Sequence, residues 1–215
     1  MTLTIRAFPA GPIETNAFLV TDQETNRAMI IDAPMDVTDT ILSAAEAAGT
    51  TVERIVITHV HWDHIGDAAV LKERTGAPLA AHPQAAEGLA KPGSATMELP
   101  FEISPASIDE MLNDGDVVTL GEHRFAVMHL PGHDTAHIAL YSEPDRMFLG
   151  GDVLFPNGHG RTDIPGSDQE TMNLSLSRLI DLPADVVVYP GHGEPTTIGK
   201  EQSWLEGLRR YQGAS

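Results

Sequence analysis

Short apolar runs rich in β-branched residues alternate with stretches of helical periodicity, and turn-forming residues separate them. The apolar runs predict strands at residues 3–8, 17–21, 28–32, 52–58, 116–120, 124–130, 138–142, 147–149 and 186–189. The periodic stretches predict helices at residues 36–48, 64–75, 168–182 and 200–211. This alternation favours a layered α/β or α+β architecture.

Residues 83–113 differ in character from the rest of the chain. They combine weak periodicity with several structure-breaking residues, as in Ala-Lys-Pro-Gly-Ser and Pro-Phe-Glu-Ile-Ser-Pro. Such a long connection is typical of an insertion over a functional site, so we expect a lid here. No linker-like stretch divides the sequence, and residues 1–215 are therefore expected to form one domain.

The composition is that of a globular protein, with 41% hydrophobic and 20% charged residues. The apolar runs are too short to cross a bilayer, and the start of the chain lacks a secretory signal pattern, so a cytoplasmic location is expected. The 13 Lys and Arg residues against 31 Asp and Glu residues give a formal net charge of −18. Such a surface repels phosphate groups, which disfavours nucleic acid and membrane partners and leaves a small-molecule substrate.

Candidate metal ligands follow directly after four predicted strands. They are His59, His133, Asp152 and His192, and a glycine precedes each of the last three. If these strands lie in packed sheets, their carboxyl ends meet at one edge and bring distant residues together. A glycine there permits a backbone conformation that a side chain would oppose. The chain has no cysteine, so thiolate ligands, cysteine nucleophiles and disulfides are excluded.

The densest group of candidate ligands is the run His59-Val60-His61-Trp62-Asp63-His64. His59 and His61, two residues apart in extended backbone, point to the same side and can bind one metal ion. Asp63 and His64 lie at the turn into the next predicted helix and can address a second ion. With the three later ligands there are five histidines and two aspartates, which suit two metals sharing a carboxylate and a hydroxide.

This ligand spacing resembles the metallo-β-lactamase superfamily, whose fold is an α+β, four-layer αββα sandwich. Further motifs resemble its short glyoxalase II-like (hydroxyacylglutathione hydrolase-like) subgroup, and they lie at residues 11–16, 151–155, 160–166 and 190–201. The resemblance covers essentially the whole chain. The sequence departs from the family pattern after His133, where Asp134-Thr135-Ala136 replaces a threonine followed by Pro-Gly.

The resemblance implies a role for each candidate ligand. The first metal ion would be held by His59, His61 and His133, the second by Asp63, His64 and His192, and both by Asp152. Imidazole and carboxylate ligands suit several divalent ions, so zinc is expected first, with iron or manganese as alternatives. Asp63 and Asp152 are also candidates for orienting the attacking hydroxide.

The expected reaction is hydrolysis of a thioester such as S-D-lactoylglutathione. A water molecule shared by two divalent ions has its pKa lowered from about 16 toward 7 and becomes the nucleophile. The thiolate then leaves readily because it is a weak base. Two alternatives from the same superfamily remain open: a mononuclear iron persulfide dioxygenase, which the chain resembles around residues 160–163, and a metal-dependent lactonase or esterase.

Other residues have more than one reading. Asp32 resembles an aspartate that supports the metal site in this superfamily, and a strand-end cap fits as well. Arg161 and His159 are candidates for substrate contact, with an ion pair between Arg161 and Asp163 as the structural alternative. Trp62 fits packing and substrate stacking equally. The remaining histidines are expected on the surface or in packing: His82, His123, His129 and His137.

Overall fold

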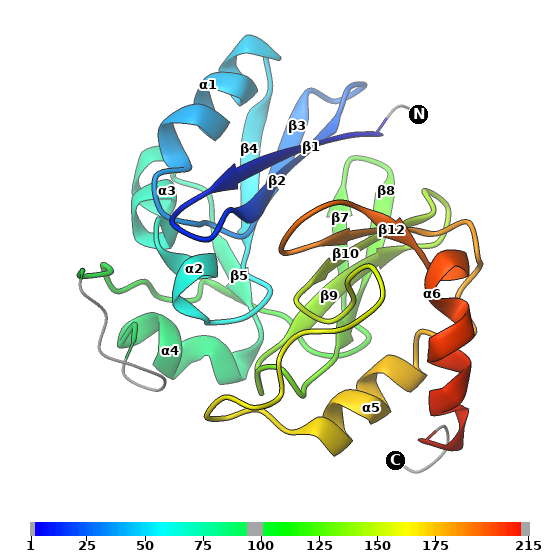
Figure 1. Ribbon diagram of the computed structural model, residues 1–215. Coiled ribbons are helices and arrows are strands. Elements are labelled where there is room, and N and C mark those ends of the chain that lie inside the picture. Colours follow the sequence, from blue (N-terminus) through cyan, green and yellow to red (C-terminus); the bar gives the residue numbers. More distant parts are fainter. Residues whose placement is uncertain (1–2, 94–100, 212–215) are drawn as a thin grey trace.

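The structure is a computed structural model that describes residues 3–93 and 101–211, and its strands form two mixed six-stranded sheets (Figure 1). The first sheet contains, in spatial order, β1 (Leu3–Ala10), β2 (Thr15–Asp22), β3 (Arg27–Ile31), β4 (Thr51–Val56), β5 (Leu79–Ala81) and β6 (Glu110–Met111). The second contains β12 (Thr196–Thr197), β11 (Val187–Pro190), β10 (Met147–Gly151), β9 (Ile138–Ser142), β8 (His123–His129) and β7 (Val117–Leu120).

Helices cover the outer faces of the two sheets (Figure 1). The first sheet carries α1 (Thr38–Ala47) and α3 (Ala68–Thr75), and the second carries α5 (Gln169–Ser177) and α6 (Ile198–Leu205). The shorter helices are α2 (Trp62–Ile65), α4 (Ala86–Ala90) and the 3₁₀ turns η1 (Pro83–Ala85) and η2 (Glu206–Tyr211). The predicted αββα sandwich is confirmed. In the described part of the chain, no helix combines the length and apolar character that a membrane span requires.

Three apolar cores separate these four layers, because side chains along a strand alternate between the two faces of its sheet. Met29 and Ile31 of β3 point into the core between the sheets. Ile30, between them in sequence, packs in the outer core that also contains Ile41 of α1. Phe148 of β10 lies in the opposite outer core, with the apolar residues of α5 and α6.

The helix predicted over residues 64–75 is two helices in the structure, α2 and α3, which are separated near Gly66. A side chain at Gly66 would not fit, since its Cβ would lie 2.3 Å from the Cγ of Met35. The first helix begins at Trp62, so the last two ligands of the histidine-rich run lie within a helical turn.

The strands that sequence patterns missed are the shortest ones, β5, β6 and β12, with three, two and two residues. Runs of this length carry too few positions to show a period of two. The region predicted as a lid contains η1, α4 and β6, and β6 pairs in parallel with β5 at the edge of the first sheet. Residues 94–100 of that region lie outside the described residues, so the lid stays a prediction.

Both sheets direct strand ends to one edge, where the candidate ligands lie. β3, β4 and β5 run parallel to one another, and so do β10 and β11. β8 has the same direction as β10 because each is antiparallel to β9. The residues that follow these strands therefore meet although they are far apart in sequence: Asp32, His59, His133, Asp152 and His192.

Candidate metal centre

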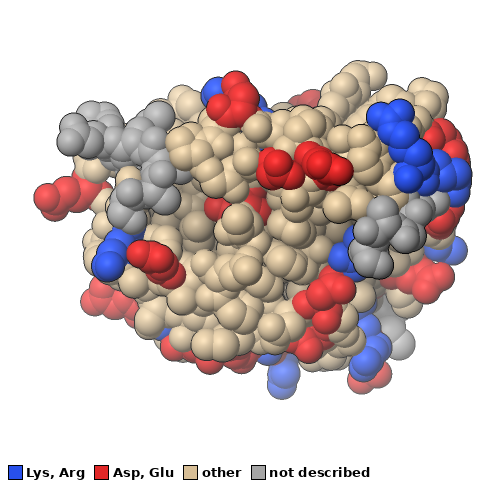
Figure 2. All heavy atoms as spheres, turned by 90° about the horizontal axis from the view of Figure 1, so that it is seen from below, with Lys and Arg blue, Asp and Glu red and all other residues tan. Residues whose placement is uncertain are grey.

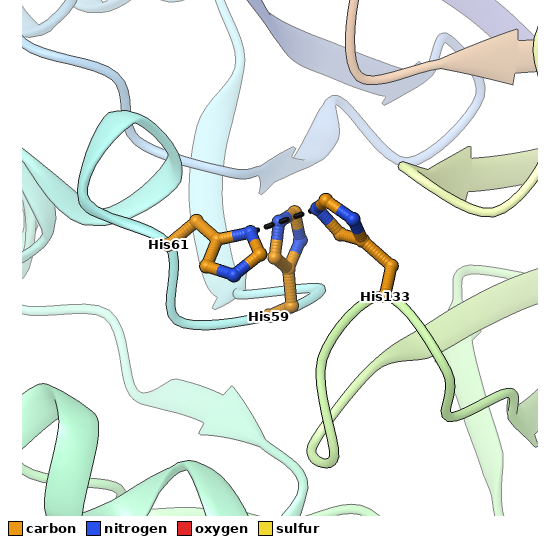
Figure 3. A group of neighbouring side chains, drawn as sticks. All are labelled: His59, His61 and His133. Carbon is orange, nitrogen blue, oxygen red and sulfur yellow. Dashed lines mark hydrogen bonds between the residues drawn. The ribbon is translucent and has the colours of Figure 1, made fainter. Parts of the chain in front are cut away.

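His59, His61 and His133 come from two loops and turn their rings toward one another (Figure 3). The Nδ1 atom of His61 lies 2.8 Å from Nε2 of His133. The ring centroid of His59 lies 4.7 Å from that of His61 and 5.0 Å from that of His133. One nitrogen of each ring lies within 4.8 Å of the other two, so the three imidazoles can bind a single metal ion.

A second group lies beside the first and consists of Asp63, His64 and His192. The Oδ2 atom of Asp63 lies 3.2 Å from Nε2 of His192 and 3.3 Å from Nε2 of His64. Asp152 reaches both groups, because its Oδ1 lies 3.4 Å from Nε2 of His64 and its Oδ2 lies 3.4 Å from Nε2 of His133. The structure thus brings together all seven ligand candidates of the sequence.

Two carboxylates and His59 have the charge states that metal ligands need. Burial by itself would raise the pKa of Asp152, but the neighbouring His64 and His133 outweigh it and hold that pKa at about 2. The pKa of Asp63 is also lowered, since contacts with histidines outweigh its burial. Burial lowers the pKa of His59 and keeps this imidazole neutral. Ionised carboxylates and neutral imidazoles are the forms that bind a metal. Against the effect of burial, nearby carboxylates raise the pKa of His64 and of His192, so a metal ion would displace a proton from these two rings.

Three polar atoms of the candidate ligands are buried and make no hydrogen bond: Nε2 of His59, Nε2 of His64 and Oδ1 of Asp152. Leaving such an atom unpaired costs about 1–3 kcal/mol. Ligand atoms of these same three residues lie within 4.8 Å of one another, close enough to share one cation. Divalent ions bound at the centre would satisfy all three atoms, so the residues present fit a metal centre.

Asp32 fixes the orientation of two candidate ligands, His64 directly and His59 through Thr58. Its carboxylate accepts hydrogen bonds from the backbone N–H of Thr58 (2.7 Å), from the Thr58 hydroxyl (2.8 Å) and from Nδ1–H of His64 (2.8 Å). Because the Thr58 hydroxyl donates to Asp32, its oxygen accepts from Nδ1–H of His59 at 3.0 Å. In its neutral form each of these two histidines therefore carries its proton on Nδ1 and leaves Nε2 free for a metal. Asp32 occupies the supporting position that the resemblance implies.

His137 belongs to the centre, although the sequence pattern indicated only a packing or surface residue. It is fully buried, its ring stacks on that of His59 at 4.7 Å, and its Nε2 accepts the backbone N–H of Asp152 at 3.0 Å. The sequence feature that could have revealed this role is the position of His137 directly before the predicted strand 138–142. In an antiparallel sheet the beginning of that strand lies at the same edge as the ends of its neighbours.

Thr15 and Asn16 also support the ligands, and the sequence assigned them no individual role. The Thr15 hydroxyl donates to Oδ2 of Asp63 at 2.7 Å. The side-chain amide of Asn16 donates to the carbonyl oxygens of Pro190 and Gly193, both at 3.0 Å. These bonds hold the loop around the last histidine ligand against the first β-hairpin.

The glycines before the ligands act in two different ways. Gly132 and Gly151 have the positive φ angles that the sequence pattern predicts, 137° and 49°. Gly191 does not have a positive φ angle, and glycine is needed there because there is no room for a side chain. A Cβ at Gly191 would lie 2.1 Å from Oδ1 of Asp152 and 2.6 Å from Cε1 of His64. Glycine is required there because the two ligands occupy the volume of a side chain.

A pocket of about 660 Å³ opens beside the ligands, and both residues predicted to contact substrate, Arg161 and His159, line it. The Arg161 guanidinium also pairs with the carboxylate of Asp163 through two hydrogen bonds, of 2.8 and 3.1 Å. Arg161 therefore both lines the pocket and forms the ion pair with Asp163 that the sequence offered as the alternative. Trp62 lines the same pocket, and its ring lies 5.5 Å from that of Phe101.

Comparisons with known proteins agree with this geometry. The sequence profile described as "Metallo-beta-lactamase superfamily" matches residues 10–192. The chain is 31% identical to the hydroxyacylglutathione hydrolase GloC of Haemophilus influenzae, covering 93% of this chain and 95% of the relative. It is similar to the crystal structure of the BLEG-1 B3 metallo-beta-lactamase, with a TM-score of 0.86 and 30% identity over 96% of this chain and 100% of the other. It is also similar to the crystal structure of TTHA1623 in a di-iron-bound form, with a TM-score of 0.71 and 33% identity. That match covers 91% of this chain and 96% of the other.

Proposed function

The chain belongs to the metallo-beta-lactamase superfamily as a metallo-hydrolase, and we propose that it cleaves thioesters at a dinuclear metal centre. The observation that carries the proposal is the meeting of seven ligand-type side chains in two adjacent groups with Asp152 in reach of both. Two adjacent sites of this kind allow both ions to act on one scissile bond.

The ligands divide between the two ions in the order that the sequence motifs imply. His59, His61 and His133 would hold one ion, Asp63, His64 and His192 the other, and Asp152 would contact both. Two bound divalent ions would lower the pKa of a shared water toward 7 and stabilise negative charge on the substrate's carbonyl oxygen. Zinc is the first choice, and the di-iron form of one solved relative keeps iron as an alternative.

The chain's own carboxylates orient the attacking group. The pKa of Asp63 and that of Asp152 are both lowered by neighbouring histidines against the effect of burial, so both side chains accept hydrogen bonds at neutral pH. Oδ2 of Asp63 is already engaged by the Thr15 hydroxyl, whereas Oδ1 of Asp152 makes no hydrogen bond. A thiolate is a weak base and leaves without protonation, so no side chain is needed as a general acid.

Two observations support a thioester as the substrate. Motifs of the glyoxalase II-like subgroup lie at residues 11–16, 160–166 and 190–201. The structure gives the first and last of these motifs positions beside the ligands, through Thr15 and Asn16. The relative named hydroxyacylglutathione hydrolase matches nearly the whole length of this chain.

The test combines metal analysis with turnover. We expect two metal ions per purified chain, and faster hydrolysis of S-D-lactoylglutathione and simple thioesters than of lactones. His133→Ala should lose metal and activity, whereas His129→Gln, a histidine outside the ligand groups, should keep both. Less than one metal ion per chain together with no ester turnover would contradict the proposal. Oxygen uptake with sulfite release from glutathione persulfide would instead identify the dioxygenase alternative.

A further inference from the structure

The pocket beside the metal centre has an apolar wall. Besides five of the candidate ligands, it is lined by Ile13, Trp62, Phe155, Ile164 and Pro165. The Phe155 ring lies 6.3 Å from the ring of His192, so the apolar surface begins directly at the ligands. A pocket of about 660 Å³ is large enough for a small-molecule substrate.

Ile13 is the clearest sign that this wall serves a ligand. It lies in the turn between β1 and β2 and is 50% exposed, whereas most isoleucines of the described chain are buried. The other exposed large apolar side chains among the described residues are Val70, Met111 and Val117, and none of these lines the pocket. An apolar group in the pocket would cover Ile13 and remove it from water.

Positive charge is scarce around this pocket. Among its described lining residues, Arg161 is the only Lys or Arg, and its guanidinium is already paired with Asp163. On the face shown in Figure 2, Lys and Arg side chains lie mostly toward the edge, and the largely uncharged middle contains acidic side chains. The formal charge of the chain is −18. The two carboxylates of a glutathione carrier would thus find no free side-chain cation in the pocket.

We propose that the pocket selects thioesters and esters whose acyl group is an uncharged apolar chain or ring and whose thiol or alcohol part is also uncharged. This inference rests on the proposed hydrolase function and narrows its substrate class. In the reaction, water adds to the carbonyl carbon and the acyl bond to sulfur, or to oxygen in an ester, breaks. A carboxylic acid and a thiol or an alcohol are released. An acylglutathione is then a poorer substrate than a neutral thioester with the same acyl group.

The first experiment compares kcat/KM for three synthetic thioesters with the metal-loaded protein. Hexanoyl-N-acetylcysteamine should exceed acetyl-N-acetylcysteamine by at least about tenfold, because four additional methylene groups are buried. It should exceed hexanoylglutathione by at least about threefold, because the glutathione part carries net negative charge. Equal or faster turnover of hexanoylglutathione would overturn the inference while leaving thioester hydrolysis intact.

The second experiment separates the inference from the proposed function through binding alone. S-Hexyl-N-acetylcysteamine, an uncleavable thioether, should bind the protein more tightly than S-hexylglutathione in calorimetry, whether or not any thioester is hydrolysed. Ile13→Ser should lower the hexanoyl-over-acetyl preference and the thioether affinity by roughly fivefold. Val70→Ser, a matched change of an exposed apolar residue outside the pocket, should leave both unchanged. Equal behaviour of the two variants would show that Ile13 does not form part of the selecting wall.

Discussion

At the scale of single residues, the centre depends on side chains and glycines that would never touch a metal ion. The ring of His137 accepts a hydrogen bond from the backbone N–H of Asp152 and packs against the ring of His59. Such contacts fix where a ligand points, and their loss typically weakens metal binding by 10–100-fold. Both His137 and Gly191 can be changed without removing any ligand, which makes their contribution measurable.

Replacing His137 tests whether it positions Asp152. His137→Phe removes the acceptor for a buried N–H, and we expect about 10–100-fold weaker metal binding in a chelator competition. The free energy of unfolding should fall by about 1–3 kcal/mol, since a buried donor loses its partner. His137→Gln offers an amide oxygen to the same N–H and should recover part of the affinity. Wild-type metal affinity in the phenylalanine variant would rule out a positioning role.

Gly191→Ala tests the close packing of ligands against the backbone. Its Cβ would lie 2.1 Å from Oδ1 of Asp152, so the carboxylate must move and we expect at least about a tenfold loss of metal affinity. Gly158→Ala is the matched control, because a Cβ there has no atom within 4 Å. Metal content per chain and thermal unfolding of both variants check this. Equal metal content in the two variants would contradict the steric argument.

At the scale of elements, two strand ends from different sheets meet in a pair of stacked histidines. His82 follows β5 and His129 ends β8, and their ring centroids lie 3.9 Å apart at an interplanar angle of 11°. Burial, together with the charge of the neighbouring His129, lowers the pKa of His82, although Asp114 opposes this. The contact lies outside the metal ligands and links the two sheets.

His82→Asn tests the pH dependence of this contact. A histidine with a lowered pKa in the folded state binds protons better when unfolded, so wild-type stability falls as pH drops below about 6.5. Asparagine can still accept the N–H of Gln84, as His82 Nδ1 does, but it does not titrate. Chemical denaturation of both metal-free proteins at pH 7.5 and 5.5 should show wild type losing more stability than the variant. A pH-independent difference between them would refute the effect.

At the scale of the whole molecule, the chain has far more acidic residues than the metal centre uses, and its formal net charge is −18. Only two of the 31 acidic residues, Asp63 and Asp152, belong to the candidate ligands. The remaining negative charge acts on any substrate that approaches the pocket. Salt screens this field, with a Debye length of about 10 Å at 0.1 M.

The field predicts a salt response for charged substrates and none for neutral ones. Raising the ionic strength from 20 to 200 mM should increase kcat/KM for S-D-lactoylglutathione about two- to threefold, because repulsion of the anionic substrate is screened. The value for a neutral N-acetylcysteamine thioester should stay constant, and it serves as the control for salt effects on the protein itself. A decrease for lactoylglutathione would show that attraction, by the metals or Arg161, dominates its approach.

The ligand candidates were open to sequence reasoning because four of them follow apolar strand patterns, the other three lie in the run that begins at His59, and strand ends of one direction share an edge. For Asp32 the resemblance to the superfamily implied a supporting role, with a strand-end cap as the alternative, and the structure shows the supporting contacts. His137 was missed because it precedes its strand, and Thr15 because its partner Asp63 lies 48 positions away. The shortest strands escaped because two or three residues show no periodicity.

The sequence by itself determined the chemistry of the centre: imidazoles and carboxylates without thiolates, at strand ends, in an αββα fold with a strongly acidic surface. Local residue types suffice for the donor atoms, and periodicity for a layered α/β or α+β architecture, because both act within a few positions of the chain. The αββα fold itself was implied by the resemblance of the ligand motifs to the superfamily. Only the tertiary structure decided that Gly191 is required for space and that Ile13 and Phe155 line the pocket beside the ligands. These facts depend on atoms brought together from distant segments, and no local pattern specifies them.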